Sequence, residues 1–477
     1  MSRSRVDDTT IETRLPADLL ALRGKGAGAW ALVIVYERAQ PDRVGEIGFV
    51  DGSWLLGRGD KREGDEHERV RFYRQRPGAL EPTAPLETEH LSRKQLVLKS
   101  TATGIEVESI GRCPMSIDGT PSARGELVEG DTLGFGNELV FLVVRRPMVL
   151  ARLAGKYDDF AFGTADRFGI VGESPAAWKL RSDALFAAES EQHVLVLGES
   201  GAGKELCANA VHGLSRRAKA KLVARNAATI PEGLIDAELF GHARNYPNPG
   251  MPERDGLIGE ADGSTLFLDE IGELPARLQA HLLRVLDAKG EYQRLGETTA
   301  RQSDVRVVAA TNRAVADLKH DFAARLTLRV RVPPIGERRE DIPLLIRHLL
   351  AKMGAEHPQL ARFFVDAKPR MDAELVDALL RHDYELHARE LATLLWQAVS
   401  ESEGDSIGLT ESVRTALAKD EMPTSEVSSS REASKEQVEA ALRRNAGNVT
   451  RAALELGLKN RFALYRLMKT LGIASKD

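Results

Sequence analysis

A glycine-rich turn between an apolar run and a helical pattern constrains this chain more than any other feature. The run HVLVL at 193–197 leads into GESGAGKE at 198–205, and the helical pattern ELCANAVHGL begins at Glu205. This is the spacing of a phosphate-binding loop. In such a loop backbone N–H groups converge on phosphate oxygens, the lysine adds a charge, and the helix N-terminus adds its dipole. The pattern predicts nucleotide binding by Gly198, Glu199, Ser200, Gly201, Ala202, Gly203, Lys204 and Glu205.

Two carboxylates at the end of a second apolar run support nucleotide hydrolysis. Alone, the glycine loop could be an ordinary turn, and Glu205 stands where the pattern usually has the Ser or Thr that contacts Mg²⁺. About 65 residues beyond the loop, STLFLDEI ends a predicted strand in Asp269 and Glu270. Asp269 suits Mg²⁺, and Glu270 can polarise the attacking water. VVAATN places Asn312 at the tip of the next strand, where an amide can sense the γ-phosphate. We therefore expect hydrolysis of a nucleotide with Mg²⁺ as cofactor.

The order of apolar and helical patterns predicts a parallel α/β core followed by helices. HVLVLGES, KLVARN, STLFLDEI and DVRVVAATN are candidate buried strands, and helical patterns lie between them. We expect the α/β domain over 167–337 and helices alone over 338–420. A polar linker over 421–431 then leads into a final helical segment, 432–477.

Ordered motifs in the middle of the chain resemble one family. Residues from about 168 to 400 carry, in order, ESPAAWKL, GESGAGKE, NAATIPEGLIDAELFGH, ADGSTLFLDEI, LQAHLLRVL, VRVVAATN and PPIGERREDIP. This region resembles the bacterial enhancer-binding proteins, the sigma-54-dependent transcription activators of the AAA+ class. The resemblance implies an ATPase core with a helical lid, a homo-oligomer between dimer and hexamer, and the sigma-54 RNA polymerase holoenzyme as partner.

The resemblance also assigns roles to single residues. Asn226 matches the asparagine that holds the catalytic glutamate until the partner is engaged, and Glu270 matches that glutamate. Arg325 matches the arginine finger that reaches the ATP of a neighbouring subunit. Lys319 stands where the family usually has a second arginine, and lysine lacks the planar fork. Arg389 matches the sensor arginine of the lid, although the usual WPGN before it reads YELH here.

One surface loop departs from the family pattern. Between ELFGH and ADGSTLFLDE the family carries GAFTGA, whose Phe and Thr engage sigma-54, whereas the same spacing gives NYPNPG at 245–250 here. The two prolines predict a stiffer loop, in which Tyr246 is either a displaced aromatic contact or part of a plain turn. One alternative function is therefore an ATP-dependent DNA-binding regulator that does not contact sigma-54. A machine acting directly on DNA, such as a replication initiator, fits the motifs least.

Short apolar runs separated by Gly, Pro and Asp predict an all-β sandwich over 30–146. Within it, 60–89 is charged and contains prolines, and we expect one long loop there. A polar leader over 1–29 precedes the sandwich, and a charged connector over 147–166 follows it.

The same β region resembles the forkhead-associated (FHA) domain through SWLLGRG, HLSRKQLVL and IDGTPSARGELVEGDTLGFG. The resemblance implies a phosphothreonine protein as partner, and Arg58, Ser92 and Arg93 can offer hydrogen bonds to its phosphate. Gln95 replaces the family's structural histidine, and the usual loop asparagine is replaced near Cys113. The alternative is an FHA fold that only packs against its neighbours or self-associates.

The end of the chain predicts a DNA-binding domain. Residues 431–477 hold ten Lys and Arg against five Asp and Glu, although the whole chain carries a net charge of −5. Three short helical patterns with intervening turns resemble the Fis-type helix-turn-helix, which implies an upstream palindromic DNA site. The residues expected on or beside the recognition helix are Asn460, Arg461, Tyr465, Arg466 and Lys469.

The composition limits the cellular compartment in which we expect this chain. No apolar run approaches the ~20 residues that a membrane span needs, and the polar N-terminus lacks a secretory signal. Two cysteines, Cys113 and Cys207, fit a reducing cytosol. We therefore expect a cytoplasmic, multidomain regulator without a membrane partner. It would bind DNA, hydrolyse ATP in an AAA+ ring to remodel a sigma-54 polymerase complex, and be gated by its FHA domain.

Overall fold

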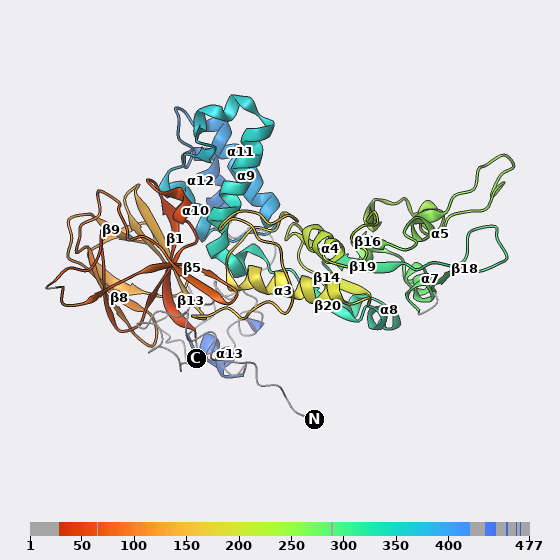
Figure 1. The fold of residues 1–477 in the computed structure, drawn as a ribbon, viewed down its shortest axis with the longest axis horizontal. Coiled ribbons are helices and arrows are strands. Elements are labelled where there is room, and N and C mark those ends of the chain that lie inside the picture. Colours follow the sequence, from red (N-terminus) through yellow and green to blue (C-terminus); the bar gives the residue numbers. More distant parts are fainter. Residues whose placement is uncertain are drawn as a thin grey trace. The chain divides into compact units, whose positions relative to one another are not determined.

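A computed structural model describes residues 28–63, 65–287, 290–419 and 435–444, and the single positions 455, 456, 464 and 468. The chain divides into two compact units, Met1–Leu417 and Ala418–Asp477. The larger unit contains a β-sandwich, an α/β core and a helical lid (Figure 1).

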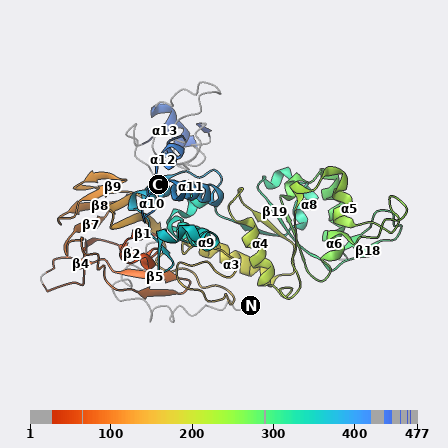
Figure 2. The same cartoon turned by 90° about the horizontal axis from the view of Figure 1, so that it is seen from above.

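The β-sandwich predicted from the sequence is confirmed. Figure 2 shows the sandwich with several of its strands labelled. One sheet has the strand order β10-β9-β12-β13-β1-β2-β5-β6, and the other has the order β11-β8-β7-β3-β4. Leu32, Ile34, Leu98 and Phe141 are among the apolar residues that fill the space between the sheets. The strands are β1 (Ala29–Glu37), β2 (Ile47–Val50), β3 (Ser53–Leu56), β4 (Glu68–Arg69), β5 (Phe72–Arg76), β6 (Ala79–Pro82), β7 (Leu96–Ser100), β8 (Ile105–Ser109), β9 (Met115–Ile117), β10 (Thr120–Ser122), β11 (Arg124–Leu127), β12 (Thr132–Phe135) and β13 (Leu139–Arg146).

The prediction of one long loop over 60–89 is wrong, because β4, β5 and β6 lie within it. Phe72 and Tyr73 are buried, and Gly78, with a φ of 72°, turns the chain between β5 and β6. Charged residues obscured the strand pattern. Arg74, for example, lies on β5 and pairs with Glu46 (Nε–Oε1 3.3 Å).

Strand β1 is buried on both faces. Leu32 and Ile34 point into the sandwich, whereas Ala31, Val33 and Val35 belong to a second apolar cluster that includes the lid. Because alternate side chains of a strand face opposite sides, a strand covered on both sides needs an uninterrupted apolar run. That is why AWALVIVY does not alternate with polar residues.

The lid packs on this outer face of the sandwich. Tyr36 Oη donates to Met371 O (2.8 Å), and Thr132 Oγ1 donates to the buried Asp377 Oδ1 (2.6 Å). Asn137 Oδ1 accepts from Ala373 N (2.7 Å) at the start of α10. The β-sandwich and the lid therefore share one apolar core. The lid elements are α9 (Ile342–Glu356), β21 (Phe364–Val365), β22 (Lys368–Pro369), α10 (Ala373–Arg381), α11 (Ala388–Glu401) and α12 (Glu411–Lys419).

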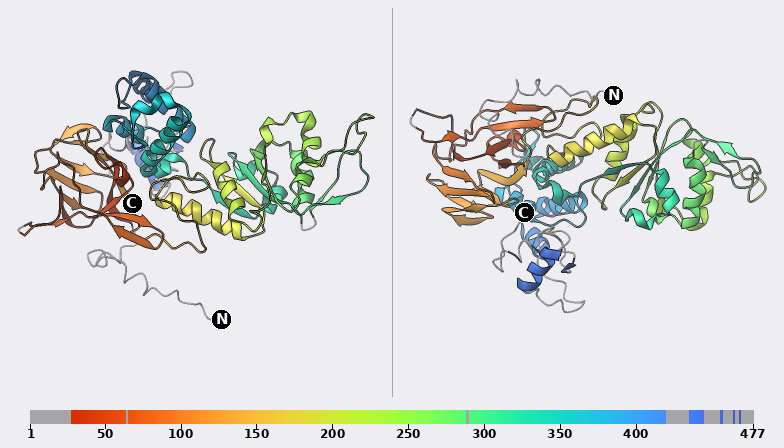
Figure 3. Two further views of the ribbon diagram at one scale, coloured as in Figure 1. Left: turned by 45° about the horizontal axis from the view of Figure 1, so that its top comes forward. Right: turned by 90° about the horizontal axis from the view of Figure 1, so that it is seen from below.

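The α/β core is a parallel sheet with helices on both faces (Figure 3). Its order is β15-β16-β19-β14-β20, and the predicted strands are confirmed. Two separate apolar clusters cover the sheet, one with α3 and α4 and the other with α5 to α8. The elements are α3 (Pro175–Glu189), β14 (Val194–Leu197), α4 (Lys204–Gly213), β15 (Val223–Asn226), α5 (Ile235–Phe240), α6 (Gly256–Glu260), β16 (Thr265–Asp269), α7 (Ala276–Leu286), β17 (Glu291–Tyr292), β18 (Arg301–Gln302), β19 (Arg306–Thr311), α8 (His320–Arg325) and β20 (Leu328–Arg331).

The connector between the sandwich and the core is packed against both. Arg76 of β5 donates to Phe160 O (2.8 Å) and pairs with Glu173 (Nη2–Oε1 2.7 Å). The Phe160 ring stacks on Trp178 of α3 at 5.7 Å. The segment expected as a charged connector therefore supplies contacts that fix the sandwich to the ATPase core.

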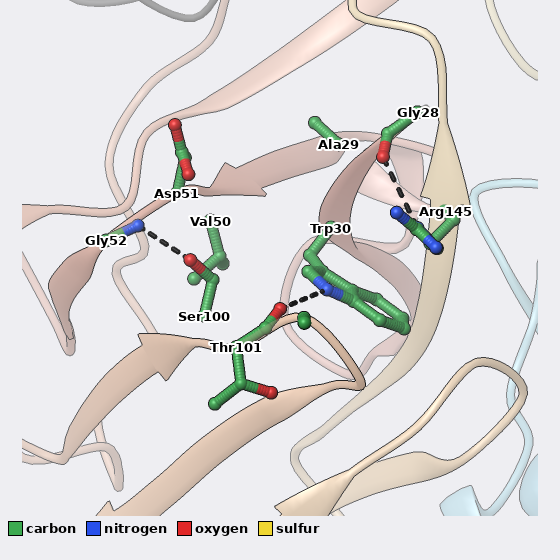
Figure 4. A pocket seen from close by; sticks show the side chains of 10 residues that line it. Gly28, Ala29, Trp30, Val50, Asp51, Gly52, Ser100, Thr101 and Arg145 are labelled. Carbon is green, nitrogen blue, oxygen red and sulfur yellow. Dashed lines mark hydrogen bonds between the residues drawn. The ribbon is translucent and has the colours of Figure 1, made fainter. Parts of the chain in front are cut away.

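A hollow at one end of the sandwich is lined by Trp30, Arg145 and neighbouring loop residues (Figure 4). The Arg145 guanidinium lies 5.1 Å from the centre of the Trp30 ring, and Trp30 Nε1 donates to Thr101 O (3.0 Å). Gly52 N donates to Ser100 Oγ (2.7 Å). These polar groups bond one another instead of converging on the hollow.

The smaller unit contains α13 (Lys435–Arg444). Val438, Ala441, Leu464 and Met468 are buried, and Arg444 pairs with Glu455 (2.8 Å). The predicted DNA-binding residues Asn460, Arg461, Tyr465, Arg466 and Lys469 lie outside the described residues. Across the part of the chain that the structure describes, no helix is long and apolar enough to cross a membrane.

Candidate nucleotide site and β-domain loops

The glycine loop joins β14 to α4, as its sequence predicts. Gly201 and Gly203 have φ values of 83° and 104°, which residues with a side chain rarely adopt. Gly203 is the N-cap of α4, so the N–H groups of the first helical turn face the loop. Gly198 N donates to Thr311 O (3.3 Å), which ties the loop to the end of β19.

Lys204 lies inside this loop, with 6% of the residue exposed. Its Nζ donates to Gly198 O (3.2 Å) and Glu199 O (3.3 Å). It also pairs with Glu270 Oε1 at 3.3 Å. The ammonium group is thus held where three oxygens converge, among them the Glu270 carboxylate from the end of β16.

Asp269 and Glu270 lie at the carboxyl end of β16, beside the glycine loop. Glu270 N donates to Asp269 Oδ1 (2.9 Å). Burial raises the pKa of Asp269, and the Glu270 N–H and Lys204 oppose that shift. Glu270 has φ 51° and ψ 45°, a left-handed conformation that is strained for this residue type. The structure thus brings together Lys204, Asp269 and Glu270, which the sequence analysis selected from separate motifs.

Asn226 ends β15 and lies opposite Asp269 in the strand register. Its Oδ1 accepts from Ala228 N (2.9 Å). Among the described residues it makes no hydrogen bond to Glu270, which pairs with Lys204 instead. Its predicted hold on Glu270 therefore stays a prediction. Asn312 directly follows β19 and is exposed.

The lid reaches the glycine loop through the turn before α11. Arg389 Nη1 donates to Ser200 Oγ (3.2 Å), so the predicted sensor arginine lies at the loop. His387 Nε2 lies 2.9 Å from Glu199 Oε2. In the sequence, this histidine stood out only as the last residue of YELH, which replaces the usual WPGN. The contact between His387 and Glu199 could not be inferred without the fold, because 188 residues separate them in the sequence.

Arg325 and Lys319 lie at the two ends of α8. The Arg325 side chain is 55% exposed and pairs with Asp287 Oδ1 (3.0 Å). Lys319 is the N-cap, and its backbone N–H donates to Gln279 Oε1 (3.0 Å). In the described part of this chain neither side chain contacts Lys204, Asp269 or Glu270.

The loop at 245–250 is exposed and internally braced. Asn245 Oδ1 accepts from Gly250 N (2.9 Å), and Asn245 N donates to Met251 O (2.9 Å). The Tyr246 ring lies over Gly296, on the segment between β17 and β18, where a side chain at position 296 would collide with it. These contacts hold the loop together in the structure, and the stiffness expected from its prolines stays a prediction.

The β domain brings Arg58, Ser92 and Arg93 onto adjacent loops. Arg58 N donates to Ser92 O (3.1 Å). Arg112, which the sequence analysis did not select, joins them because its N–H donates to Ser92 Oγ (2.9 Å). Within the described residues none of the three guanidinium groups has an ion-pair partner. The cluster therefore presents positive charge and a hydroxyl on one side of the sandwich.

Gln95 connects the loop that contains Ser92 to the loop that contains Cys113 by hydrogen bonds. It is fully buried, its Oε1 accepts from Ser92 N (3.2 Å), and its Nε2 donates to Cys113 O (2.8 Å). A glutamine can donate and accept at once, as a histidine can. The departure at Gln95 is therefore compatible with ordered loops around Ser92.

Comparison with known proteins identifies the class of chain that carries this site. Family models match at 170–336 (sigma-54 interaction domain), 336–429 (AAA+ ATPase lid domain) and 429–470 (bacterial regulatory protein, Fis family). The transcriptional regulatory protein ZraR of Escherichia coli K12 is 36% identical over 316 residues, which cover 64% of this chain and 70% of ZraR. The chain belongs to the family of sigma-54-dependent transcription activators.

Two further proteins are similar to this chain over a comparable length. The regulatory protein AtoC of Escherichia coli K12 is 34% identical over 69% of this chain and 74% of its own length. A solved structure of NtrX from Brucella abortus with ADP is 28% identical, covers 63% of this chain and 69% of that one, and has a TM-score of 0.48. As a member of this family the chain is an AAA+ ATPase and a DNA-binding transcription regulator.

Proposed function

We propose that this chain uses ATP hydrolysis to remodel a sigma-54 RNA polymerase complex from a DNA site to which its C-terminal domain binds. The observation that carries the proposal is the convergence of Lys204, Asp269 and Glu270 at one strand edge, within a region that matches the sigma-54 interaction domain. The lid arginine Arg389 contacts the glycine loop at Ser200. A nucleotide bound there would contact both the core and the lid.

The residues divide the work of hydrolysis by their chemistry. Backbone N–H groups of Gly198–Glu205 and the Lys204 ammonium would hold the phosphates. Phosphate oxygens would compete with Glu270 for Lys204, so ATP binding would free the Glu270 carboxylate to orient the attacking water. Asn226, which lies opposite Asp269 in the register, would then receive or release that carboxylate, and Asn312 would sense the γ-phosphate from the end of β19.

Asp269 fits a Mg²⁺ site. Mg²⁺ is commonly bound by one or two carboxylates together with substrate phosphates and water, and a nearby cation would favour the charged form of this buried group. Mg²⁺ bound there would neutralise part of the phosphate charge. Glu205, in place of the usual hydroxyl residue, is exposed at the start of α4 and would act from the edge of the site.

We also propose that several copies of this chain assemble into a ring. Arg325 is exposed and lies away from the Lys204 site of its own chain, which suits a finger that completes the site of a neighbouring subunit. Lys319 would add a second, non-forked positive charge to the same surface. A homo-oligomer between dimer and hexamer, as the family resemblance implies, would supply the neighbouring subunit.

The β domain is proposed to bind a phosphothreonine segment and to gate the ATPase. The cluster of Arg58, Ser92, Arg93 and Arg112 supplies a hydroxyl and three guanidinium groups without an ion-pair partner among the described residues, and such groups suit a phosphate. The β-sandwich shares its core with the lid, and the lid turn contacts the glycine loop. Ligand binding could therefore reach the ATP site through packed elements.

The phosphate-binding part is tested by fluorescence anisotropy with a phosphothreonine peptide library. We expect Arg58→Ala to lose binding and Arg124→Ala, which removes an exposed arginine of β11, to retain it. If no phosphopeptide binds, the alternative of a purely packing β domain replaces this part of the proposal.

A second function remains favoured by the loop at 245–250, which lacks the family hexapeptide. In that case the chain would be an ATP-dependent DNA-binding regulator without sigma-54 contact. The two are separated by band-shift of a sigma-54 polymerase–promoter complex in the presence of ADP and aluminium fluoride. A shift with the natural protein supports remodelling. A shift only after GAFTGA replaces residues 245–250 supports the alternative.

A further inference from the structure

Three consecutive residues of the glycine loop contact the lid, at the turn before α11 and at the first turn of α11. His387 Nε2 meets Glu199 Oε2 (2.9 Å) and Arg389 Nη1 meets Ser200 Oγ (3.2 Å). Leu386 O lies so close to Gly201 that any side chain at position 201 would collide with it. The part of the loop between Gly198 and Ala202 is thus shaped from outside by the lid.

His387 has a backbone conformation that normally requires glycine. Its φ and ψ are 53° and −125°, and Arg389 N donates to Leu386 O (3.2 Å). These values place His387 at the second residue of a type II′ turn. A side chain makes this conformation costly, and such strain persists only where the surroundings impose it, commonly at functional sites.

The side chain of His387 supplies what a glycine could not. Only 3% of it is exposed, and its Nε2 faces the Glu199 carboxylate. Because an ionised carboxylate only accepts hydrogen bonds, Nε2 must carry the proton. Nδ1 is buried and has no hydrogen-bond partner among the described residues. Within the described part of the chain, the contact with Glu199 is therefore the one polar interaction of this imidazole.

The turn is rigid on the lid side. Glu390 Oε2 accepts from Glu385 N (2.7 Å) and Leu386 N (2.9 Å), and Glu390 Oε1 bonds His382 (2.6 Å). Tyr384 Oη donates to Leu379 O (2.8 Å) of α10. His387 is therefore presented to Glu199 from a turn that cannot easily move by itself.

We infer that His387 is a positioning residue for ATP binding, which holds Glu199 and with it the phosphate-binding loop in its binding conformation. It touches the loop and not the reacting atoms. A loop already fixed in its bound shape binds its ligand more tightly, because less ordering is needed on binding. His387 should therefore affect nucleotide affinity more than the rate of the chemical step.

The test compares substitutions of His387 in the full-length chain, with ATP KM, kcat and the dissociation rate of a fluorescent ADP as readouts. His387→Gly relieves the backbone strain but removes the contact. We expect its KM and its ADP dissociation rate to rise about three- to tenfold, kcat to change less than about twofold, and thermal stability not to fall. His387→Gln offers an amide N–H to Glu199 and should recover most of the lost affinity.

A double-mutant cycle identifies the partner. Glu199→Ala should reproduce the His387→Gly effect, and the double variant should be no worse than either single variant. His357→Ala removes a lid histidine that instead packs against Trp396, and it should leave KM unchanged.

Three results would overturn the inference. The first is a wild-type KM and ADP dissociation rate in His387→Gly. The second is a double variant whose loss equals the product of the two single losses. The third is a lower melting temperature of His387→Gly with unchanged KM, which would make the residue merely structural.

Discussion

At the scale of single residues, the nucleotide site depends on charges that face one another at the end of β16. Lys204 is buried and pairs with Glu270, while Asp269 accepts from the Glu270 N–H and has its pKa raised by burial. Glu270 is also strained, with a left-handed backbone. Strain of this kind is stored where side-chain direction matters, which supports Glu270 as the residue that orients water.

Glu270→Gln should abolish hydrolysis while ATP still binds. The amide keeps the size of the side chain but removes the charge that polarises water, and we expect the rate to fall at least about 100-fold. ATP turnover and binding of a fluorescent ATP analogue measure the two effects. Glu273→Gln, which alters the exposed neighbour paired with Arg313, is the matched control and should keep its activity. Normal turnover in the Glu270 variant would remove it from the catalytic role.

These residues were predictable because each lies in a short motif directly after a strand. Lys204, Asp269 and Glu270 follow apolar runs, and parallel strands bring their carboxyl ends to one edge. Arg112 and His387 were not predictable in this way. Arg112 joins its site through a backbone N–H, and His387 through a side-chain contact with a residue far away in the sequence. Neither contact can be read from a single sequence.

At the scale of elements, β1 is the strand that joins the sandwich to the lid. Its odd-numbered residues from Ala31 to Val35 face the lid, and its even-numbered ones fill the sandwich. The sequence predicted the strand, since AWALVIVY is apolar throughout. It did not reveal that the second face belongs to helices more than 300 residues later, because burial on two sides does not say what covers each side.

Val33→Asp should loosen the lid as well as the sandwich. A carboxylate placed on the face shared with the lid lacks a partner and should lower the free energy of unfolding by roughly 3 kcal/mol or more. Hydrogen exchange of amides in α9 and α10 measures the effect on the lid. Val128→Asp changes a valine that is 42% exposed and should leave that exchange unchanged. Lid amides that stay protected in the Val33 variant would contradict the shared core.

His193, directly before β14, makes the stability of the folded state sensitive to pH. Burial lowers the pKa of His193 to about 4, below its usual value of 6.5, and its Nδ1 accepts from Val307 N (3.0 Å). The folded state therefore holds His193 neutral. Its contribution to stability is complete above pH 6.5 and is lost as the pH falls towards 4, because the unfolded chain then binds a proton that the folded chain excludes.

His193→Gln should remove part of this acid sensitivity. From the pKa difference, the wild type should lose about 2 kcal/mol at pH 5 through this group. Urea unfolding at pH 7 and pH 5 measures the loss, which should be smaller in the variant. His320→Gln, at a fully exposed histidine, should behave as the wild type. An equal loss in His193→Gln and wild type would show that another group is responsible.

At the scale of the whole molecule, the account requires cooperation between subunits. Arg325, the candidate arginine finger, pairs with Asp287 of its own chain. Among the described residues it does not contact Lys204 of that chain, so a neighbouring subunit would have to supply the arginine. Lys204→Ala subunits keep the finger, and Arg325→Ala subunits keep the phosphate loop. Each variant alone should be nearly inactive, and a mixture of the two should regain part of the ATPase activity. No recovery in the mixture would contradict a finger that acts between subunits.

Transcription in vitro from a sigma-54 promoter shows whether ATP hydrolysis by this chain opens the promoter complex. The assay uses the purified full-length protein, sigma-54 polymerase and a template that carries the protein's DNA site. The account predicts open complexes and transcripts that require hydrolysable ATP and disappear with Glu270→Gln. ATP hydrolysis at a normal rate without open complexes, restored only when GAFTGA replaces residues 245–250, would contradict it.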